Sequence, residues 1–380
     1  MQQPKKSLLF LIAAYAVLCV LVSARASIGI ASAAQLRLRR GGHFDGWGFD
    51  LQTDASGEAA RICTASFSVL SCFDAQTREL LWSQKTPYGS IDTNIVMSGG
   101  AVFYAGGGGA FTIYGLSAKT GHILWRKNHT SYSLASAARL LFADGYGSGV
   151  IALARGTGKE VWAFPGIGPG GQIGRIFAYG GKVFTSNYIL NARTGKLLKL
   201  LHTSPRVFAG VSGRVFGANL RGRLEAWDVA SGHVLWVAKA HSEMRAVALA
   251  ANSDYVFAVF YRREPFLMHH GVLKAYAASN GRLVWRRPIA SVEQKLGSDP
   301  IGADGAHVYL IEPSATAQGS RILALDARTG EPVWSLSTAE TTYGPPIPTS
   351  KLLYVATGNT RLLAIWSRSG KVRWSLPFPK

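Results

Sequence analysis

The chain has few of the residue patterns on which common catalytic sites are built. It contains no Gly-x-Ser-x-Gly turn and no metalloprotease helix, and outside the N-terminus no stretch has the 3.6-residue apolar period of a helix. The histidines stand singly except for His269 and His270, which lack the third and fourth ligands that zinc requires. The glycine runs at 106–109 and 168–171 precede no helix and therefore predict turns rather than phosphate loops.

Acidic residues are also scarce. The chain has 41 Lys and Arg against 21 Asp and Glu, a net charge of +20, and removal of residues 1–34 would leave +17. A field of this sign favours an acidic polymer, lipid head groups or an acidic envelope protein as a partner. The basic residues occur in all parts of the chain without an aromatic-interleaved stripe, so nucleic acid is not the expected partner.

The sequence contains one short motif that is repeated eight times. The motif consists of an apolar residue, a small or acidic residue, Thr or Ser, Gly, and a Trp four residues after the Gly. The Gly column falls at positions 78 (where Arg stands), 121, 158, 195, 232, 281, 330 and 370, in steps of 37 to 49 residues. A period near 40 indicates a repeat architecture whose units share a core.

Each copy consists of short apolar runs bounded by Gly, Asp and Ser, which are typical of antiparallel β-strands. A large aromatic on the last strand suits docking against the next unit. Seven copies keep this aromatic, as Trp82, Trp125, Trp162, Trp236, Trp285, Trp334 and Trp374, while Lys199 replaces it in the fourth. We therefore predict an all-β fold, an eight-bladed β-propeller of four-stranded antiparallel blades, with an open solenoid or two sandwiches as the alternatives.

The phrase Leu-Asp-Ala-x-Thr-Gly-x-x-x-Trp resembles the repeat of the pyrroloquinoline-quinone-like (PQQ-like) propeller family over residues 60 to 376. Arg78, Lys199 and Trp366 depart from its pattern. The resemblance implies either a quinone enzyme with PQQ and calcium in the central channel or a non-enzymatic scaffold, of which the outer-membrane assembly scaffold is the best-known case.

Few residues of this sequence match those that the quinone enzymes of the family use. No adjacent cysteine pair is present, most Trp residues belong to the repeat column, and Asp299 is the best-placed single carboxylate. Calcium needs several converging oxygens, so we predict no PQQ and no calcium. The prediction is a non-catalytic binding or protein-interaction scaffold, monomeric. The alternatives are a quinone-dependent sugar or alcohol dehydrogenase and a membrane-anchored sensor that binds cell-wall polymer or another polyanion.

The N-terminus predicts export. Lys5 and Lys6 precede an uncharged stretch over residues 7–24, and small residues follow it. Residues 1–34 are therefore expected to be a secretory signal peptide or, if uncleaved, a membrane anchor, and 35–380 a single propeller domain. The protein would be periplasmic, extracellular or anchored outside the cytoplasmic membrane.

Two cysteines flank a predicted two-residue turn at Phe67 and Ser68. In that register Cys63 faces Cys72 in a non-hydrogen-bonded pair, which favours a disulfide, and two buried thiols are the alternative. A disulfide would indicate an oxidising compartment.

Copies six and seven carry extra length between their second and third strands, at 261–271 and 313–320. The first insertion contains residue types that are enriched at binding hot spots. We therefore predict a binding loop there, or else an insertion without a role; its candidate residues are Arg262, Arg263, Phe266, His269 and His270.

Overall fold

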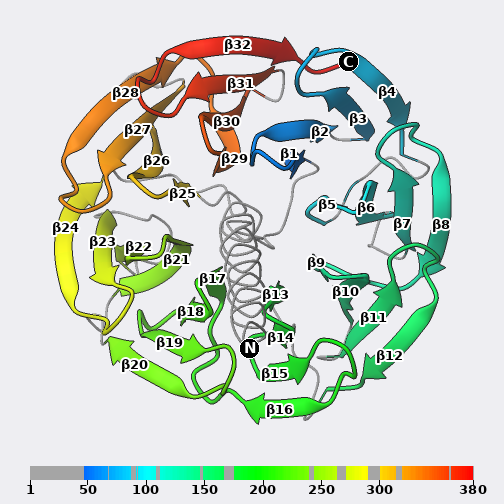
Figure 1. Ribbon diagram of the computed structural model, residues 1–380, viewed down its shortest axis with the longest axis horizontal. Helices are drawn as coiled ribbons and strands as arrows, with labels where there is room; N and C mark the ends of the chain where they lie inside the picture. The colour runs from blue at the N-terminus through cyan, green and yellow to red at the C-terminus, as the bar shows by residue number, and fades with distance from the viewer. Residues whose placement is uncertain are drawn as a thin grey trace, which may run out of the picture.

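The computed structural model is a ring of eight β-sheets around a central axis (Figure 1). It describes residues 47–66, 68–86, 91, 93–107, 112–145, 149–166, 175–238, 244–262, 271–289, 300–313, 319–358 and 361–379. Every sheet has four antiparallel strands hydrogen-bonded in chain order, and the described residues contain no helix. The predicted eight-bladed propeller is therefore confirmed.

Each blade is formed by four consecutive strands. Blade 1 has β1 (Trp47–Thr53), β2 (Ala59–Ser66), β3 (Val69–Asp74) and β4 (Leu80–Lys85); blade 2 has β5 (Val96–Ser98), β6 (Ala101–Gly106), β7 (Thr112–Ser117) and β8 (Ile123–Asn128); blade 3 has β9 (Leu134–Ala137), β10 (Leu140–Asp144), β11 (Val150–Ala154) and β12 (Glu160–Phe164); blade 4 has β13 (Phe177–Tyr179), β14 (Lys182–Phe184), β15 (Tyr188–Asn191) and β16 (Leu197–Leu200). Blade 5 has β17 (Val207–Val211), β18 (Arg214–Ala218), β19 (Leu224–Asp228) and β20 (Val234–Ala238); blade 6 has β21 (Met244–Ala251), β22 (Tyr255–Arg262), β23 (Gly271–Ala277) and β24 (Leu283–Ile289); blade 7 has β25 (Ile301–Ala303), β26 (His307–Pro313), β27 (Ser320–Asp326) and β28 (Pro332–Thr338); blade 8 has β29 (Thr342–Pro348), β30 (Leu352–Thr357), β31 (Arg361–Trp366) and β32 (Val372–Pro377).

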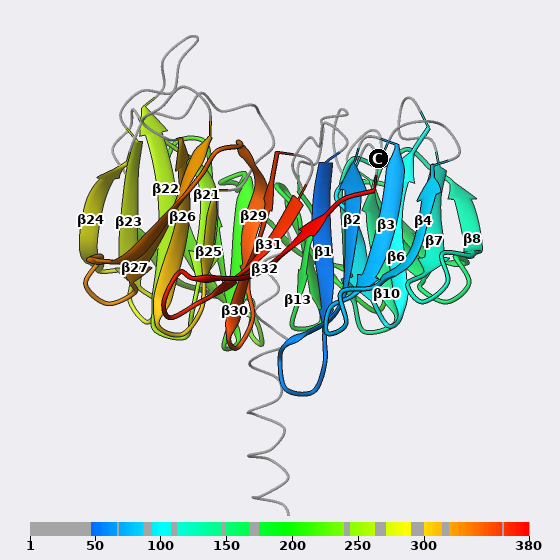
Figure 2. The same cartoon turned by 90° about the horizontal axis from the view of Figure 1, so that it is seen from above.

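The antiparallel order gives the disc two different faces. The first strand of each blade lines the centre and the fourth lies on the rim (Figure 1). The turns that join first to second and third to fourth strands lie on one side, which we call the turn face (Figure 2). The second-to-third loops and the connections between blades lie on the other side, the crossover face.

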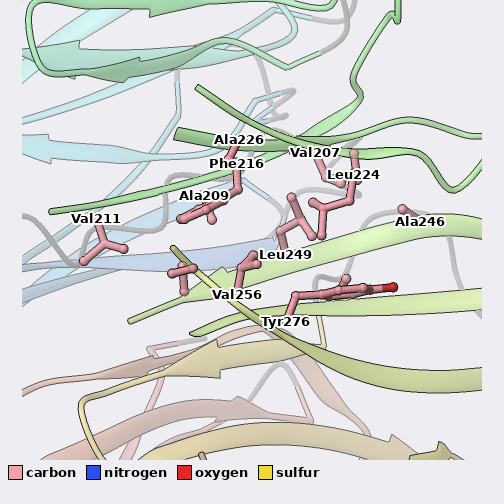
Figure 3. Close-up of a cluster of buried hydrophobic side chains, with 14 of the residues drawn as sticks. Val207, Ala209, Val211, Phe216, Leu224, Ala226, Ala246, Leu249, Val256 and Tyr276 are labelled. Atoms are coloured by element: carbon pink, nitrogen blue, oxygen red, sulfur yellow. The ribbon is translucent and has the colours of Figure 1, made fainter. Parts of the chain in front are cut away.

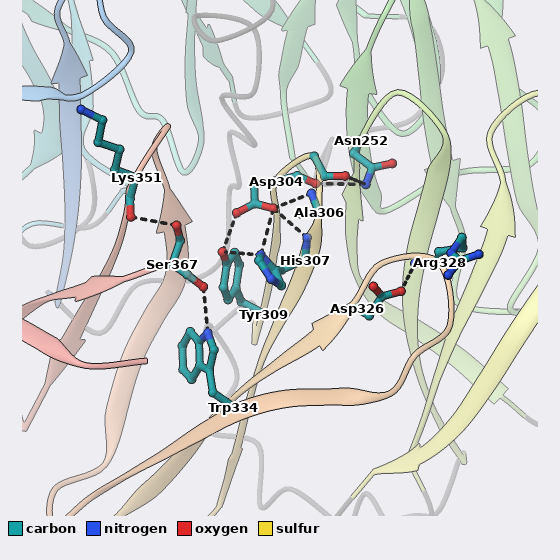
Figure 4. Close-up of polar contacts among 11 residues, drawn as sticks. Asn252, Asp304, Ala306, His307, Tyr309, Asp326, Arg328, Trp334, Lys351 and Ser367 are labelled. Carbon is teal, nitrogen blue, oxygen red and sulfur yellow. Dashed lines mark hydrogen bonds and ion pairs between the residues drawn. The ribbon is translucent and has the colours of Figure 1, made fainter. Parts of the chain in front are cut away.

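The repeated phrase forms the same bulged corner in every blade. The pairing of third and fourth strands shifts register once in all eight sheets, for example between Ala324 and Leu325 in blade 7. Asp326 Oδ1 accepts a 2.9 Å hydrogen bond from the amide of Arg328 (Figure 4) and a 2.8 Å bond from that of Thr329. These bonds, that from Thr329 first, hold the pKa of Asp326 below its usual value. Gly330 completes the corner at a φ of 76°, which glycine adopts without a steric penalty.

The repeat tryptophans join each blade to the next. Six of them donate an Nε1 hydrogen bond of 2.8–3.0 Å to a backbone carbonyl in the corner of the following blade: Trp82 to Ala118, Trp125 to Arg155, Trp162 to Ala192, Trp236 to Ala278, Trp285 to Ala327 and Trp334 to Ser367. The same indoles cover the corner glycines, because a Cβ built on Gly121, Gly158, Gly195, Gly281, Gly330 or Gly370 would lie within 2.7 Å of the ring. The absence of a side chain in the Gly column is thus a packing requirement as well as a turn requirement.

The hydrophobic core lies between neighbouring blades. Figure 3 shows one such cluster, in which side chains from blade 5 meet side chains from blade 6; its labelled members are Val207, Ala209, Val211, Phe216, Leu224, Ala226, Ala246, Leu249, Val256 and Tyr276. Each blade therefore depends on its neighbours for burial, as the short period predicts.

The ring closes by packing rather than by strand exchange. Phe49 and Ile62 of blade 1 share a buried cluster with Leu352 and Leu376 of blade 8. Glu58 also accepts hydrogen bonds from Thr349, at 3.0 Å, and from Ser350. The first described strand, β1, is the inner strand of blade 1 and not an added strand of blade 8.

Residues 1–46 lie outside the described part of the chain, so the expected signal peptide or anchor within 1–34, including the apolar stretch 7–24, stays a prediction. Among the described residues, none belongs to a helix with the length and apolar character needed to cross a bilayer.

Candidate interaction surface

The crossover ends of blades 6 and 7 frame the surface that the sequence predicts for binding. β22 ends at Arg262, whose side chain is exposed, and β23 begins at Gly271. Arg263, Phe266, His269 and His270 lie outside the described residues, so the structure places only Arg262 of the predicted binding loop. The strands of blade 6 have seven or eight residues, against three or four in blade 4, and β22 and β21 are among the long strands that reach this face (Figure 2).

A paired carboxylate stands at the base of the adjacent insertion in blade 7. Glu312 and Arg321 lie opposite each other in the register of β26 and β27, and Arg321 Nη2 lies 2.6 Å from Glu312 Oε2. The Glu312 side chain is 4% exposed, while that of Arg321 is 45% exposed. Losing the partner of a buried charge is costly, so this pair fixes the strand ends on which the loop stands. Glu312 is visible in the sequence as an acid that interrupts an apolar run, but its pairing with Arg321 depends on the strand register.

Blade 6 is strongly basic. Its described part carries one acid, Asp254, and six basic residues, Arg245, Arg262, Lys274, Arg282, Arg286 and Arg287. Lys274 is buried over the ring of Phe260, at 5.2 Å, and burial together with the nearby Arg286 charge lowers its pKa. An excess of positive charge in the blade that carries the exposed Arg262 suits a partner with an acidic surface.

A second polar cluster lies on the crossover face between blades 2 and 3. Asp144, at the end of β10, is 4% exposed, and its Oδ1 accepts hydrogen bonds of 2.8 Å from Ser131 Oγ and from the amides of Tyr132 and Ser133. His129 Nε2 lies 3.0 Å from the Asp144 carbonyl. These contacts tie the connection between β8 and β9 to blade 3. Burial raises the pKa of Asp144 to about 6, against the lowering effect of the hydrogen bonds.

This carboxyl group predicts a pH dependence of stability. Because its folded pKa lies above the ordinary value of 3.8, the folded protein binds a proton between about pH 4 and 6 that the unfolded chain releases. Stability from this group therefore rises as the pH falls through 6, by up to about 3 kcal/mol once both states are protonated. In Asp144→Asn this contribution is absent, so urea denaturation at pH 7 and pH 4.5 should show the wild type gaining stability relative to the variant. An unchanged difference would show that Asp144 has an ordinary pKa.

An Asp–His–Tyr group on the turn face of blade 7 has the residue types of an acid–base site (Figure 4). Asp304 Oδ1 accepts hydrogen bonds from the amides of Ala306 and His307, and Asp304 Oδ2 accepts a 2.5 Å bond from the Tyr309 hydroxyl. Burial acts to raise the pKa of Asp304, but the hydrogen bonds from His307 and Tyr309 outweigh it and the pKa lies below its usual value. All these donors belong to the same hairpin, so the group serves as a turn cap.

The centre of the disc does not fit a quinone–calcium site in its described part. Asp50 is the one carboxylate on the described inner strands, and its oxygens accept hydrogen bonds from the amides of Leu51 and Met97, at 2.9 and 2.6 Å. Across the described residues, no group of three His, Cys, Asp or Glu is placed to hold a metal ion. Asp299 lies outside them. Several oxygens converging on one point, which calcium needs, are not brought together by the residues that the structure describes.

Cys63 and Cys72 face each other in the register of β2 and β3, with Cα atoms 4.0 Å apart and their sulfur atoms bonded. Formation of this disulfide in the exported protein stays a prediction. The bond would close a loop with a sequence separation of 9, which in the chain-entropy account stabilises by about 2–3 kcal/mol. We expect the mature protein to resist thiol alkylation without reductant and to lose this amount of stability after reduction. Alkylation of both cysteines in the untreated protein would contradict the prediction.

The repeated motif and the closed eight-bladed ring are also found in a known protein family. Residues 45–258 and 269–378 match the family described as outer membrane protein assembly factor BamB. The chain belongs to this family. The match covers all eight blades and omits residues 259–268, which include most of the predicted binding loop in blade 6.

Two curated relatives in sequence match shorter parts of the chain. A serine/threonine-protein kinase AfsK from Streptomyces griseus is 36% identical over 116 residues, which are 29% of this chain and 13% of that protein. An outer membrane protein assembly factor BamB from Kangiella koreensis is 28% identical over 143 residues, which are 36% of this chain and 33% of that protein. The aligned parts thus span a third or less of either relative's length.

Solved structures share the fold at low identity. BamB from Moraxella catarrhalis has a TM-score of 0.60 at 13% identity and covers 80% of this chain and 92% of its own. A quinohemoprotein alcohol dehydrogenase from Pseudomonas putida HK5 has a TM-score of 0.59 at 14% identity, covering 89% of this chain and 73% of its own. At these identities both show the propeller alone.

Proposed function

We propose that this chain is an exported, non-catalytic scaffold of the cell envelope that holds a partner protein on the crossover face of blades 6 and 7. The observation that carries the proposal is the match to the BamB family on both sides of residues 259–268. The matched residues form the scaffold that the chain shares with the family, and residues 259–268 lie outside the match. Outer-membrane assembly is the process in which we expect the partner to act, because the family's description names it.

The charges of the surface support a protein partner with an acidic face. Arg262 is exposed at the edge of a blade with six described basic residues and one acid. Arginine is a residue type on which interface energy concentrates, and long-range attraction of this sign speeds association. The ring beneath gives such a loop a rigid base, as functional loops usually have.

Replacement of residues 263–270 by a short Gly-Ser link tests the proposal. The variant should keep the wild-type melting temperature, because the replaced residues lie between two strand ends that pair with each other. Affinity capture from the cell envelope with the mature protein should recover outer-membrane assembly proteins, and the variant should lose them. Arg262→Ala should weaken capture, and Arg328→Ala, an exposed arginine on the turn face, should not.

Unchanged capture by the loop variant would overturn the assignment of the surface. Dye-linked oxidation of alcohols or sugars after addition of quinone and calcium would overturn the non-catalytic assignment and favour the dehydrogenase alternative.

A further inference from the structure

The seam between blades 4 and 5 differs from the seams that a tryptophan closes. Lys199 stands in the Trp column of blade 4. Its Nζ donates a 3.3 Å hydrogen bond to the Gly232 carbonyl, and Lys182 Nζ donates to the carbonyls of Val229 and Ala230. Val229 holds the corner position whose carbonyl accepts the indole N–H at the other seams. Two ammonium groups therefore replace the hydrogen bond of the missing tryptophan.

No side chain covers the corner glycine in place of the missing indole. A Cβ built on Gly232 meets no atom within 4 Å, whereas one built on Gly195 or Gly281, the corner glycines of the two neighbouring seams, would lie within 2.7 Å of a tryptophan ring. Gly232 has a positive φ of 74°, and the other corner glycines have values of 67–76°. The corner of blade 5 thus keeps a backbone shaped to receive an aromatic ring that its neighbouring blade does not supply.

The inner part of this seam is closed by other aromatic residues. Phe177 stacks on Phe208 with ring centroids 6.1 Å apart, and Phe184 contacts Trp227 at 6.5 Å. Trp227 is 1% exposed and occupies a position where five of the other copies carry Leu or Ile. Because these rings hold the two blades together, the open space at the rim is not needed for the stability of the fold.

Exposed apolar side chains flank the open space on both strands of the rim. Leu198 and Leu200 of β16 are 45% and 43% exposed, and Val234, Leu235 and Val237 of β20 are 40–46% exposed. These two strands lie next to each other on the outer edge of the ring (Figure 1). Lys199 stands among these apolar residues on β16, and Lys182 of β14 reaches the same blade 5 corner.

The stretch of chain that contains blade 4 has no carboxylate. Residues 161–224 include nine Lys and Arg and no Asp or Glu, although acids occur before and after this stretch. Blade 4 falls wholly inside it. Blade 4 therefore brings only positive charge to the seam. On the blade 5 side, Asp228 in the corner interacts electrostatically with Lys182.

From this combination we propose that the rim seam between blades 4 and 5 binds an acidic segment of a partner protein by taking one aromatic side chain of that segment into the space beside Gly232. The carboxylates of the segment would pair with Lys182, Lys199 and their neighbours, and its ring would occupy the place that a repeat tryptophan occupies at six other seams. This surface is separate from the blade 6 loop, so the proposal stands or falls independently of the crossover-face assignment.

The test uses a labelled Asp-Glu-Trp-Glu-Asp peptide and the mature protein, with binding followed by fluorescence anisotropy. The peptide should bind, and the same peptide with Ala in place of Trp should bind roughly tenfold more weakly, because the buried ring is the anchor. Lys199→Trp should abolish binding, since the protein's own indole would fill the space, and should raise the melting temperature. Lys159→Trp, an exposed lysine in blade 3 whose seam already holds Trp162, should bind as the wild type does.

Leu235→Asp provides a second measurement of peptide binding, which does not depend on whether Lys199→Trp folds. The exposed position tolerates the change, while the added carboxylate repels the acidic peptide, so binding should weaken several-fold. Equal binding of the Trp and Ala peptides, or unchanged binding to Lys199→Trp, would overturn the proposal. A third result would also overturn it: wild type and Lys199→Trp bind vesicles with anionic lipid equally, and the wild type does not prefer the Trp peptide to the Ala peptide. The seam would then be a general polyanion-binding surface.

Discussion

Trp236→Ala is expected to lower the free energy of unfolding by about 3–5 kcal/mol, the usual cost of removing a large buried aromatic. Trp236 is 8% exposed, packs against Phe216 with ring centroids 5.7 Å apart and donates a 3.0 Å hydrogen bond to the Ala278 carbonyl. Its loss would open a cavity over Gly281 and leave that carbonyl without its indole donor. Chemical denaturation of the mature protein measures the change.

Trp366→Ala is the matched control for this prediction. Trp366 lies outside the repeat column and is 38% exposed, so its removal should cost less than about 1 kcal/mol, as for most surface changes. Trp236→Phe should fall between the two, because it keeps most of the ring and loses the N–H donor. A cost for Trp236→Ala no larger than that of Trp366→Ala would contradict the role of the repeat tryptophans in joining the blades.

Gly330→Ala is expected to cost clearly more than Gly232→Ala. Both glycines have positive φ, 76° and 74°, and therefore share a backbone penalty of about 1–2 kcal/mol. A Cβ on Gly330 would in addition lie 2.7 Å from Trp285 Cδ2, while one on Gly232 would meet nothing within 4 Å. Overpacking of this kind adds about 1–3 kcal/mol, so the difference between the two variants measures the seam contact alone.

Thermal and urea denaturation of the two variants decide the comparison. Arg78, which adopts a φ of 69° in the same column, shows that a side chain can occupy this backbone conformation when a neighbour permits it. Equal losses for the two variants would mean that the seam between blades 4 and 5 is as tightly filled as the others, and would remove the ground for a docking site there.

The repeat made most of the fold predictable from sequence. The spacing of the glycine column predicts the number of blades, and the apolar runs before each corner predict the strands. Both predictions hold because equivalent residues make equivalent packing contacts in every blade. The two-residue turn at Phe67 and Ser68 likewise placed Cys63 opposite Cys72, as the register of β2 and β3 has it. How the ring closes was left open, since it depends on contacts between Phe49 and Leu352, some 300 residues apart.

The surfaces were less predictable than the fold. Lys199 was visible as a departure from the repeat, but its consequence depends on Gly232 and Lys182, which come together only in the folded ring. The pairing of Glu312 with Arg321 depends on strand register in the same way. The stretch without acids at 161–224 was readable from the sequence, yet its meaning depends on the unfilled space beside it.

Site-specific photo-crosslinking in the native cell envelope tests most directly whether this propeller is a scaffold. A photoreactive residue at position 262, on the crossover face, should capture an envelope protein of the outer-membrane assembly process, and one at position 328, on the turn face, should not. Capture at neither position, with a tightly held quinone recovered from the purified protein, would contradict the account.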